Sequence, residues 1–184
     1  DKSNPATCVS CHDNTPHKQN ERLNQHATKV ACQTCHIPEY ARGGVPTKMR
    51  WDWSKAGERD ASGQQITRKD AKGHIIYESR KGSFELGENV KPEYFWFNGD
   101  VTYTLVTDPV DKANGVTQIN RLGGSAADGK SMIWPVKVFR GKQPYDPVNK
   151  TLVKPHTAGN DDTGIVDQNI QTAVALAVSL MAPT

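Results

Sequence analysis

The stretches Cys8-Val9-Ser10-Cys11-His12 and Cys32-Gln33-Thr34-Cys35-His36 contain all the cysteines of the chain. Each is a Cys-x-x-Cys pair followed at once by histidine, which is the pattern of c-type haem attachment. The chemistry requires this spacing, because two thiols on one turn add across the two vinyl groups of a porphyrin and the next residue turns its imidazole to the iron. The sequence therefore predicts two covalently attached haems c, bound through Cys8, Cys11, Cys32 and Cys35, with His12 and His36 as proximal iron ligands.

Other uses of Cys-x-x-Cys pairs compete with haem attachment. The 20 residues between Cys11 and Cys32 also fit a structural zinc site, and two disulfides or a thioredoxin-like redox pair are further uses of Cys-x-x-Cys. The histidines favour haem, because zinc gives no reason for histidine to follow both pairs directly. In a chain of this composition two such motifs arise by chance with a probability of roughly 10⁻⁵.

Composition narrows the class of protein around these motifs. The 184 residues include 23 Lys and Arg and 20 Asp and Glu. The resulting net charge of +3 is too small to indicate a nucleic-acid-binding protein. Hydrophobic residues make up only 35%, beside 15 Gly and 11 Pro, which indicates one loop-rich domain. The longest apolar run, residues 173–181, is too short for a membrane span. Two porphyrins would supply the apolar core that the side chains lack.

The attachment chemistry also predicts a location. Thioether attachment of haem takes place outside the bacterial cytoplasm, so we expect a periplasmic or extracellular protein. The sequence starts at Asp1 without a charged and then apolar stretch, which is consistent with a signal peptide already removed.

Four histidines lie outside the motifs and are candidates for the sixth position on each iron. His17 and His26 lie between the two motifs, where the backbone must wrap both porphyrins, and they are predicted as the distal ligands. His74 follows Gly73 at an expected hairpin tip, and His156 follows a proline, so these two are reserve candidates.

The expected fold class is α+β and loop-rich. Residues 1–45, the motif segment, are expected to bind both haems with short helical turns and a helix near Asn20–Thr28. Residues 46–158 are expected to form a β-rich region packed on the haems, with a hairpin of Gln64–Lys69 and His74–Arg80. Further strand candidates are Tyr94–Phe97, Val101–Val106, Val116–Ile119 and Ile133–Phe139.

Residues 159–184 are expected to add a C-terminal helix, so that the three regions form one compact domain. Asn169–Met181 is apolar on nearly all faces, which is typical of a helix buried against haem or another subunit.

Several longer stretches carry a resemblance to a known family. They are Val30 to Pro38 with Tyr40-Ala41-Arg42-Gly43-Gly44, Trp51-Asp52-Trp53-Ser54, Cys11-His12-Asp13 with Thr15-Pro16-His17, Pro92-Glu93-Tyr94 with Trp96-Phe97-Asn98-Gly99, and Ile133-Trp134-Pro135-Val136-Lys137 with Gly141 to Asp146. In these residues the chain resembles a middle segment of the octahaem tetrathionate-reductase-like family of c-type cytochromes, over roughly residues 5–152. The family's other haem motifs are absent from this sequence.

The resemblance implies bis-histidine haems arranged as an electron conduit, with His17 and His26 at positions like the family's distal ligands. Two haems cannot store the electrons that the relatives' multi-electron reductions need, so we expect an electron carrier and not an enzyme. It would exchange electrons with other redox proteins or extracellular acceptors, with copies associating into an extracellular filament. The alternatives are a soluble periplasmic dihaem shuttle and, less favoured, a small reductase of nitrogen or sulfur oxyanions.

Overall fold

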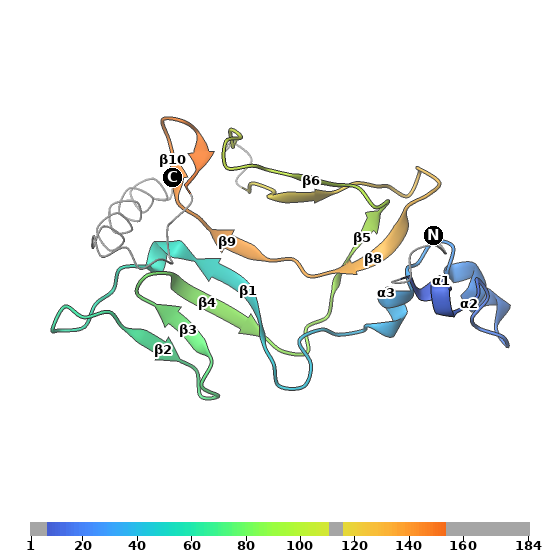
Figure 1. The fold of residues 1–184 in the computed structure, drawn as a ribbon, viewed down its shortest axis with the longest axis horizontal. Helices are drawn as coiled ribbons and strands as arrows, with labels where there is room; N and C mark the ends of the chain where they lie inside the picture. Colours follow the sequence, from blue (N-terminus) through green and yellow to red (C-terminus); the bar gives the residue numbers. More distant parts are fainter. Residues whose placement is uncertain (1–6, 111–115, 154–184) are drawn as a thin grey trace. The chain divides into compact units, whose positions relative to one another are not determined.

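The computed structural model describes residues 7–110 and 116–153, and these fall into two compact units (Figure 1). Unit 1 takes its residues from Asp1–Tyr40, Asn89–Tyr103 and Asn120–Val138. Unit 2 takes them from Ala41–Glu88, Thr104–Ile119 and Phe139–Thr184.

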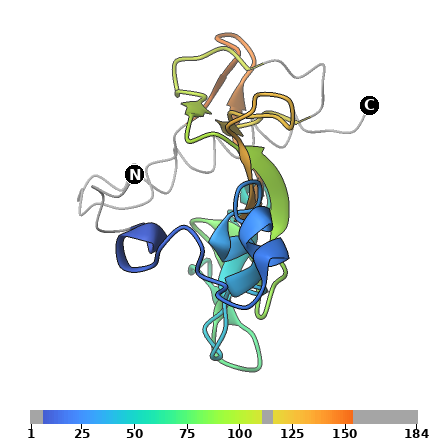
Figure 2. The ribbon, with the colours of Figure 1, turned by 90° about the vertical axis from the view of Figure 1, so that its right-hand side faces the viewer.

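Unit 1 contains the helices of the described residues, and they are short (Figure 2). They are α1 (Cys8–Cys11), α2 (Glu21–His26) and α3 (Cys32–His36), with 4, 6 and 5 residues. Of these three, only α2 has a side-chain cap, in which Oδ1 of Asn20 accepts the Leu23 N–H at 3.1 Å. Helices of this length are not stable by themselves and depend on what they pack against.

The expected fold class is therefore wrong. The described residues are mostly strands and loops, and the N-terminal segment is not a helical one but coil carrying three short helical turns. The physical reason is that this segment contributes one buried apolar residue, Ala31, so a longer helix would find no apolar surface to pack on. The expected C-terminal helix Asn169–Met181 and His156 lie outside the described residues.

A two-stranded antiparallel ribbon supports the motif segment in unit 1. Strand β5 (Glu93–Phe97) pairs with β8 (Met132–Val136), and Phe95 lies opposite Trp134. The Ile133 N–H donates to the Lys29 carbonyl at 2.8 Å, and the Ile133 carbonyl accepts the Ala31 N–H at 3.0 Å. The start of α3 is thus attached to β8. A second pair, β6 (Val101–Tyr103) with β7 (Asn120–Leu122), completes the strands of this unit.

Unit 2 is built on a five-stranded sheet in the order β2-β3-β4-β1-β9. Its strands are β1 (Thr47–Asp52), β2 (Thr67–Lys69), β3 (Ile75–Glu78), β4 (Gly82–Gly87) and β9 (Arg140–Lys142). Neighbouring strands are antiparallel except for β1 and β9, which run parallel. A 3₁₀ turn, η1 (Trp53–Lys55), follows β1, and a short pair joins β10 (Tyr145–Asp146) to β11 (Thr151–Leu152).

The hairpin expected around Asp70–Gly73 is present as β2 and β3. The strand expected at Val116–Ile119 is not: the nearest strand is β7, which begins at Asn120. The strand expected over Val101–Val106 ends at Tyr103, and that over Ile133–Phe139 shifts to Met132–Val136. The differences at β6 and β8 lie at the ends of strands, where sequence patterns locate boundaries least well.

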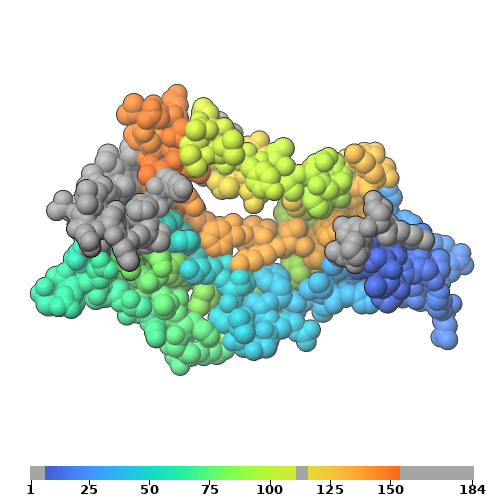
Figure 3. All heavy atoms as spheres, viewed as in Figure 1, coloured from blue at the N-terminus to red at the C-terminus, as the bar shows by residue number. Residues whose placement is uncertain are grey.

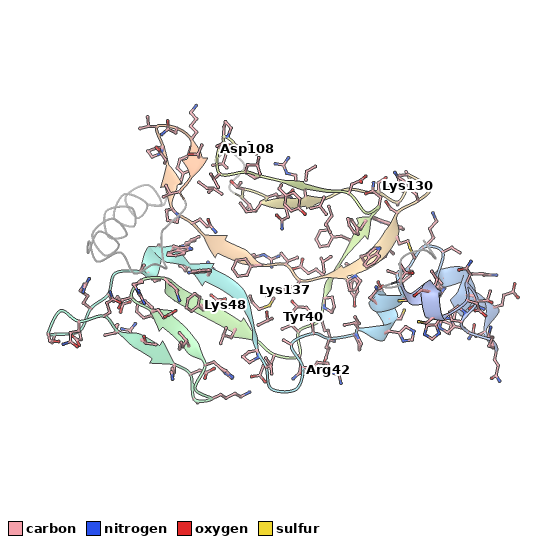
Figure 4. All side chains as sticks on the ribbon, in the orientation of Figure 1. Tyr40, Arg42, Lys48, Asp108, Lys130 and Lys137 are labelled. Carbon is pink, nitrogen blue, oxygen red and sulfur yellow. The ribbon has the colours of Figure 1, made fainter. Side chains whose placement is uncertain are left out.

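The core of unit 2 is aromatic. The rings of Trp51 and Trp53 stack with centres 4.6 Å apart, and Phe84 meets Trp51 edge-on at 5.2 Å. The Lys48 ammonium lies 3.8 Å from the centre of the Phe84 ring, on the sheet (Figure 4). Burial lowers the pKa of Lys48, and the nearby Lys81 lowers it further. Lys48 thus contributes a cation–π contact at a desolvation cost.

Candidate haem-binding site

The two cysteines of each motif lie on one helical turn. Cys8 and Cys11 are the two ends of α1, and Cys32 and Cys35 lie three residues apart on α3. This spacing puts the thiols of each pair on the same helix face, as attachment to one porphyrin requires. Cys8, Cys11 and Cys35 are exposed. Figure 3 shows the described part of the motif segment in blue at one end of the view.

Cys32 is the most enclosed of the cysteines. Burial raises the pKa of its thiol, and Cys8 of the other motif is a further cause of the rise. The two motifs therefore lie close enough in unit 1 for their first cysteines to influence each other.

His17 and His36 form the central feature of the site. Their ring centres are 6.3 Å apart and the ring planes differ by 18°. Two imidazoles on opposite sides of one metal ion have ring centres roughly 6–6.5 Å apart, because a metal–nitrogen bond measures about 2.0–2.1 Å and a five-membered ring with bonds of about 1.33 Å has a radius of roughly 1.1 Å. The observed pair fits that spacing.

A second observation separates this pair from an ordinary aromatic contact, since aromatic rings also pair at about 4.5–7 Å. Within the described residues, Nδ1 of His17 is buried and has no hydrogen-bond partner. A buried ring nitrogen without a partner is costly, and a ligand that the chain binds would remove that cost. The spacing of the ring centres therefore matches that of two imidazoles on one iron, in a pair whose ring planes are stacked.

Hydrogen bonds hold the backbone of His17 in place. The Asn24 side chain brackets it: the His17 N–H donates to Oδ1 at 3.0 Å and Nδ2 donates to the His17 carbonyl at 3.1 Å. The same carbonyl accepts the Asn20 N–H at 3.0 Å. Helix α2, on which Asn24 lies, thus fixes the backbone at His17.

His36 is held from the other side, through α3. Besides the backbone bonds between Ala31 and Ile133, the Thr34 hydroxyl donates to the Ile133 carbonyl at 2.8 Å. Thr34 occupies a variable position inside the second motif, so the sequence pattern gave no sign of its role. Asn24 was also missed, because a lone asparagine carries no spacing signal.

The other predicted iron ligands are not brought together. His12 follows α1 and is exposed, and His26 ends α2 and is exposed; in the described ranges no ring pairs with either of them as His17 pairs with His36. His74 belongs to unit 2, where its Nδ1 lies 3.1 Å from Asp70 Oδ2. The Asp70 carboxylate also accepts the N–H groups of Lys72 and His74, so the carboxylate and His74 close the hairpin turn.

No cluster of three or more His, Cys, Asp or Glu side chains able to hold a metal ion occurs within residues 7–110 and 116–153. That range also contains no helix suited to crossing a membrane.

Comparison with known proteins agrees with the haem chemistry. A family model described as bacterial cytochrome c matches residues 48–182, a range that begins after both Cys-x-x-Cys-His motifs. The crystal structure of an octahaem cytochrome c from Shewanella oneidensis is similar, with a TM-score of 0.75 and 36% sequence identity over 95% of this chain. The chain spans only 39% of that protein's length. No sequence among the curated proteins matches.

Proposed function

The chain belongs to the bacterial cytochrome c family, and on that premise we propose that it is a dihaem electron carrier. It is a multihaem c-type cytochrome resembling the octahaem protein, and membership of the family implies covalently attached haem c and redox partners. The number of haems and the residues that hold them are part of the proposal.

In this proposal Cys8 and Cys11 hold the first haem, and Cys32 and Cys35 the second. His12 and His36 are the proximal ligands. Each haem supplies a one-electron couple when bound. The residues of the chain would hold the haems and supply the iron ligands.

The observation that carries the proposal is the His17–His36 pair, with ring centres 6.3 Å apart and one buried nitrogen that lacks a partner. On this basis we propose His17 as the distal ligand of the second motif's iron, although His17 lies only five residues after His12. The loop after the first motif would then contribute to both haem sites. His26 remains the predicted distal ligand of the first iron.

The test removes the first haem and then the distal ligand of the second. A Cys8→Ser/Cys11→Ser variant should carry one haem, by mass, with a low-spin visible spectrum. Adding His17→Ala should convert that haem to high-spin, and added imidazole should restore the low-spin form. His26→Ala in the same background is the matched control and should stay low-spin. If the His17→Ala variant stays low-spin, the assignment is wrong.

Electron transfer without substrate turnover follows from the ligands. An iron held by two histidines has no position for a substrate, whereas a reductase of nitrogen or sulfur oxyanions needs an exchangeable one. Carbon monoxide distinguishes the two: the reduced protein should not bind it, and rapid binding at one haem would favour the reductase.

We place the protein in the periplasm or outside the cell, because thioether attachment of haem occurs there. Redox proteins or extracellular acceptors would be its partners. One candidate is a soluble electron shuttle, which needs no contact between copies of the chain. The second candidate is a filament built from such copies. What supports the filament is that the chain matches about two fifths of an octahaem protein, so further copies could extend the haem series. Electron microscopy of the native protein tests this, and isolated particles alone would leave the shuttle.

A further inference from the structure

Among the residues that the structure describes, the outer edge of β5 carries backbone groups without partners. On β8, both the N–H and the carbonyl of Ile133 point away from β5, because they bond to Lys29 and Ala31. Trp96, which lies opposite Ile133, is therefore in a non-hydrogen-bonded pair, and its own N–H and carbonyl also point away from β8.

The same alternation applies to Tyr94. It lies opposite Pro135, two residues along, and proline has no N–H to donate across the ribbon. Within the described residues, the N–H and carbonyl groups of Tyr94 and Trp96 have no hydrogen-bond partner. The edge of β5 thus presents two residues with free donors and acceptors.

The usual protections of a strand edge are missing from β5. Charged residues and proline normally block such edges, yet Tyr94 to Phe97 contains neither, and only Pro92 and Glu93 stand at the start of the strand. The outer edge of β8 differs, since it is occupied at Ile133 and lacks a donor at Pro135. The side chains of Tyr94 and Phe95 are 51% and 43% exposed.

We propose that β5 pairs with β5 of a second copy of this chain, antiparallel about a two-fold axis at Phe95. This register places Tyr94 of one copy opposite Trp96 of the other, and each such pair exchanges both hydrogen bonds. Phe95 meets Phe95 of the second copy in the non-hydrogen-bonded position, where side chains lie closest. The free N–H and carbonyl groups of Tyr94 in one copy thus face those of Trp96 in the other copy.

The choice of a second copy rests on this self-complementarity. In the two-fold register Glu93 lies opposite Phe97 of the other copy, so no like charges face each other. Pro92 ends the pairing at one end, and Asn98, whose N–H bonds to the Gly123 carbonyl, ends it at the other. The product is a four-stranded sheet, which is more stable than the isolated two-stranded ribbon.

The contact would also bring the haem sites of two copies together. The ribbon is attached through Ile133 to the start of α3, so pairing at β5 joins two motif segments in one assembly. A two-fold contact closes on itself, and a filament would need a second interface. The proposal concerns how copies meet and stands whether or not the dihaem assignment holds.

The first experiment measures association of the holoprotein by sedimentation, followed by haem absorbance over a range of concentrations. Tyr94→Lys should weaken the dimer at least tenfold, since it puts a charge on each side of the pairing. Tyr103→Lys is the matched control: Tyr103 is a 63% exposed aromatic residue whose strand β6 is already paired, and the dimer should be unaffected. A monomer at every concentration, or an unchanged constant for Tyr94→Lys, would overturn the proposal.

A second experiment tests the register. In the proposed pairing the Cα atoms at position 95 are about 4.5 Å apart, within the range of about 4.4–6.8 Å for a disulfide. Phe95→Cys should therefore form a cross-linked dimer on oxidation, whereas Phe97→Cys, which lies opposite Glu93, should not. Equal cross-linking at both positions contradicts the register. Protection of the Trp96 amide from exchange that does not depend on concentration would show that the chain's own residues cover the edge, and would also overturn the proposal.

Discussion

Asp128 closes the loop between β7 and β8 with one carboxylate. It accepts the N–H groups of Ser131 at 2.7 Å, Lys130 at 2.9 Å and Ser125 at 3.1 Å, and the hydroxyl of the buried Ser131. The hydroxyl and N–H of Ser131 are the main causes that hold the pKa of Asp128 far below its ordinary value of 3.8. A pKa lowered by folding means that the ionised form stabilises the fold.

We expect Asp128→Asn to lower the stability of the holoprotein at neutral pH. Its free energy of unfolding should also fall less than that of the parent as the pH is lowered. The stabilisation by Asp128 is fully present above the unfolded pKa and is lost as the pH falls toward the folded one. The difference between parent and variant in the midpoint of guanidinium unfolding should therefore shrink from about pH 5 downward.

Asp100→Asn serves as the control, because Asp100 is an exposed carboxylate of the same unit. Its midpoint should follow that of the parent at every pH. An Asp128→Asn variant that loses the same stability at low pH as at neutral pH would contradict the expectation, since the carboxylate charge would then have no part in it.

At the scale of single residues, the motifs predict the chemistry of the site but not its three-dimensional arrangement. The spacing of Cys32, Cys35 and His36 is sufficient to predict haem attachment, because that chemistry acts within one helical turn. That the ring of His17 lies beside that of His36 could not be predicted, because it depends on how α2 and α3 approach each other. Asn24 and Thr34, whose side chains form the hydrogen bonds that fix this approach, belong to no recognisable sequence motif.

Gly82 decides how β4 meets the end of β1. Its φ is +83°, and a Cβ built there would lie 2.1 Å from the Asp52 carbonyl oxygen. Gly82→Ala should therefore destabilise the protein by about 2–5 kcal/mol, of which roughly 1–2 kcal/mol comes from the left-handed backbone and the rest from the clash. Thermal or guanidinium unfolding measures the change.

Gly63 offers a control with the same backbone. Its φ is also +83°, but nothing lies within 4 Å of the position its Cβ would take. Gly63→Ala should cost only the backbone part, about 1–2 kcal/mol. Equal losses at the two glycines would show that the Asp52 carbonyl moves aside easily.

At the scale of elements, turn chemistry was predictable and length was not. The run Asp70-Ala71-Lys72-Gly73 predicted the hairpin of β2 and β3 because the side chain of Asp70 and the free φ of Gly73 act locally. The helical N-terminal segment was wrong because the motifs predict single turns, and only tertiary packing determines whether such turns extend. Pairing of β1 with β9, about 90 residues apart, has no local signal either.

The two units differ in what holds them together. Apart from prolines, the buried apolar side chains of the described residues are Ala31, Trp53, Tyr77, Phe84 and Val110, and of these only Ala31 belongs to unit 1. Unit 1 instead exposes large apolar side chains, which include Leu23, Ile37, Tyr94, Phe95 and Tyr103. A unit that buries so little apolar surface lacks the main driving force of folding unless another apolar body provides it. The haems fill that role in our proposal.

Haem attachment should therefore decide the folding of unit 1 and leave unit 2 largely unchanged. In a Cys32→Ser/Cys35→Ser variant, amides of the β5–β8 ribbon should exchange with solvent more than tenfold faster, which corresponds to a loss of over about 1.4 kcal/mol in opening free energy. Amides of β1, β3 and β4 should keep their protection, because Trp53, Tyr77 and Phe84 pack without haem. Hydrogen exchange read by mass spectrometry resolves the two sets.

The matched variant, Cys8→Ser/Cys11→Ser, should loosen α1 and affect the ribbon less, because the bonds to β8 come from residues 29–34. If unit 1 stays fully protected without the second haem, its stability comes from contacts within the chain, and the haem does not contribute to its folding.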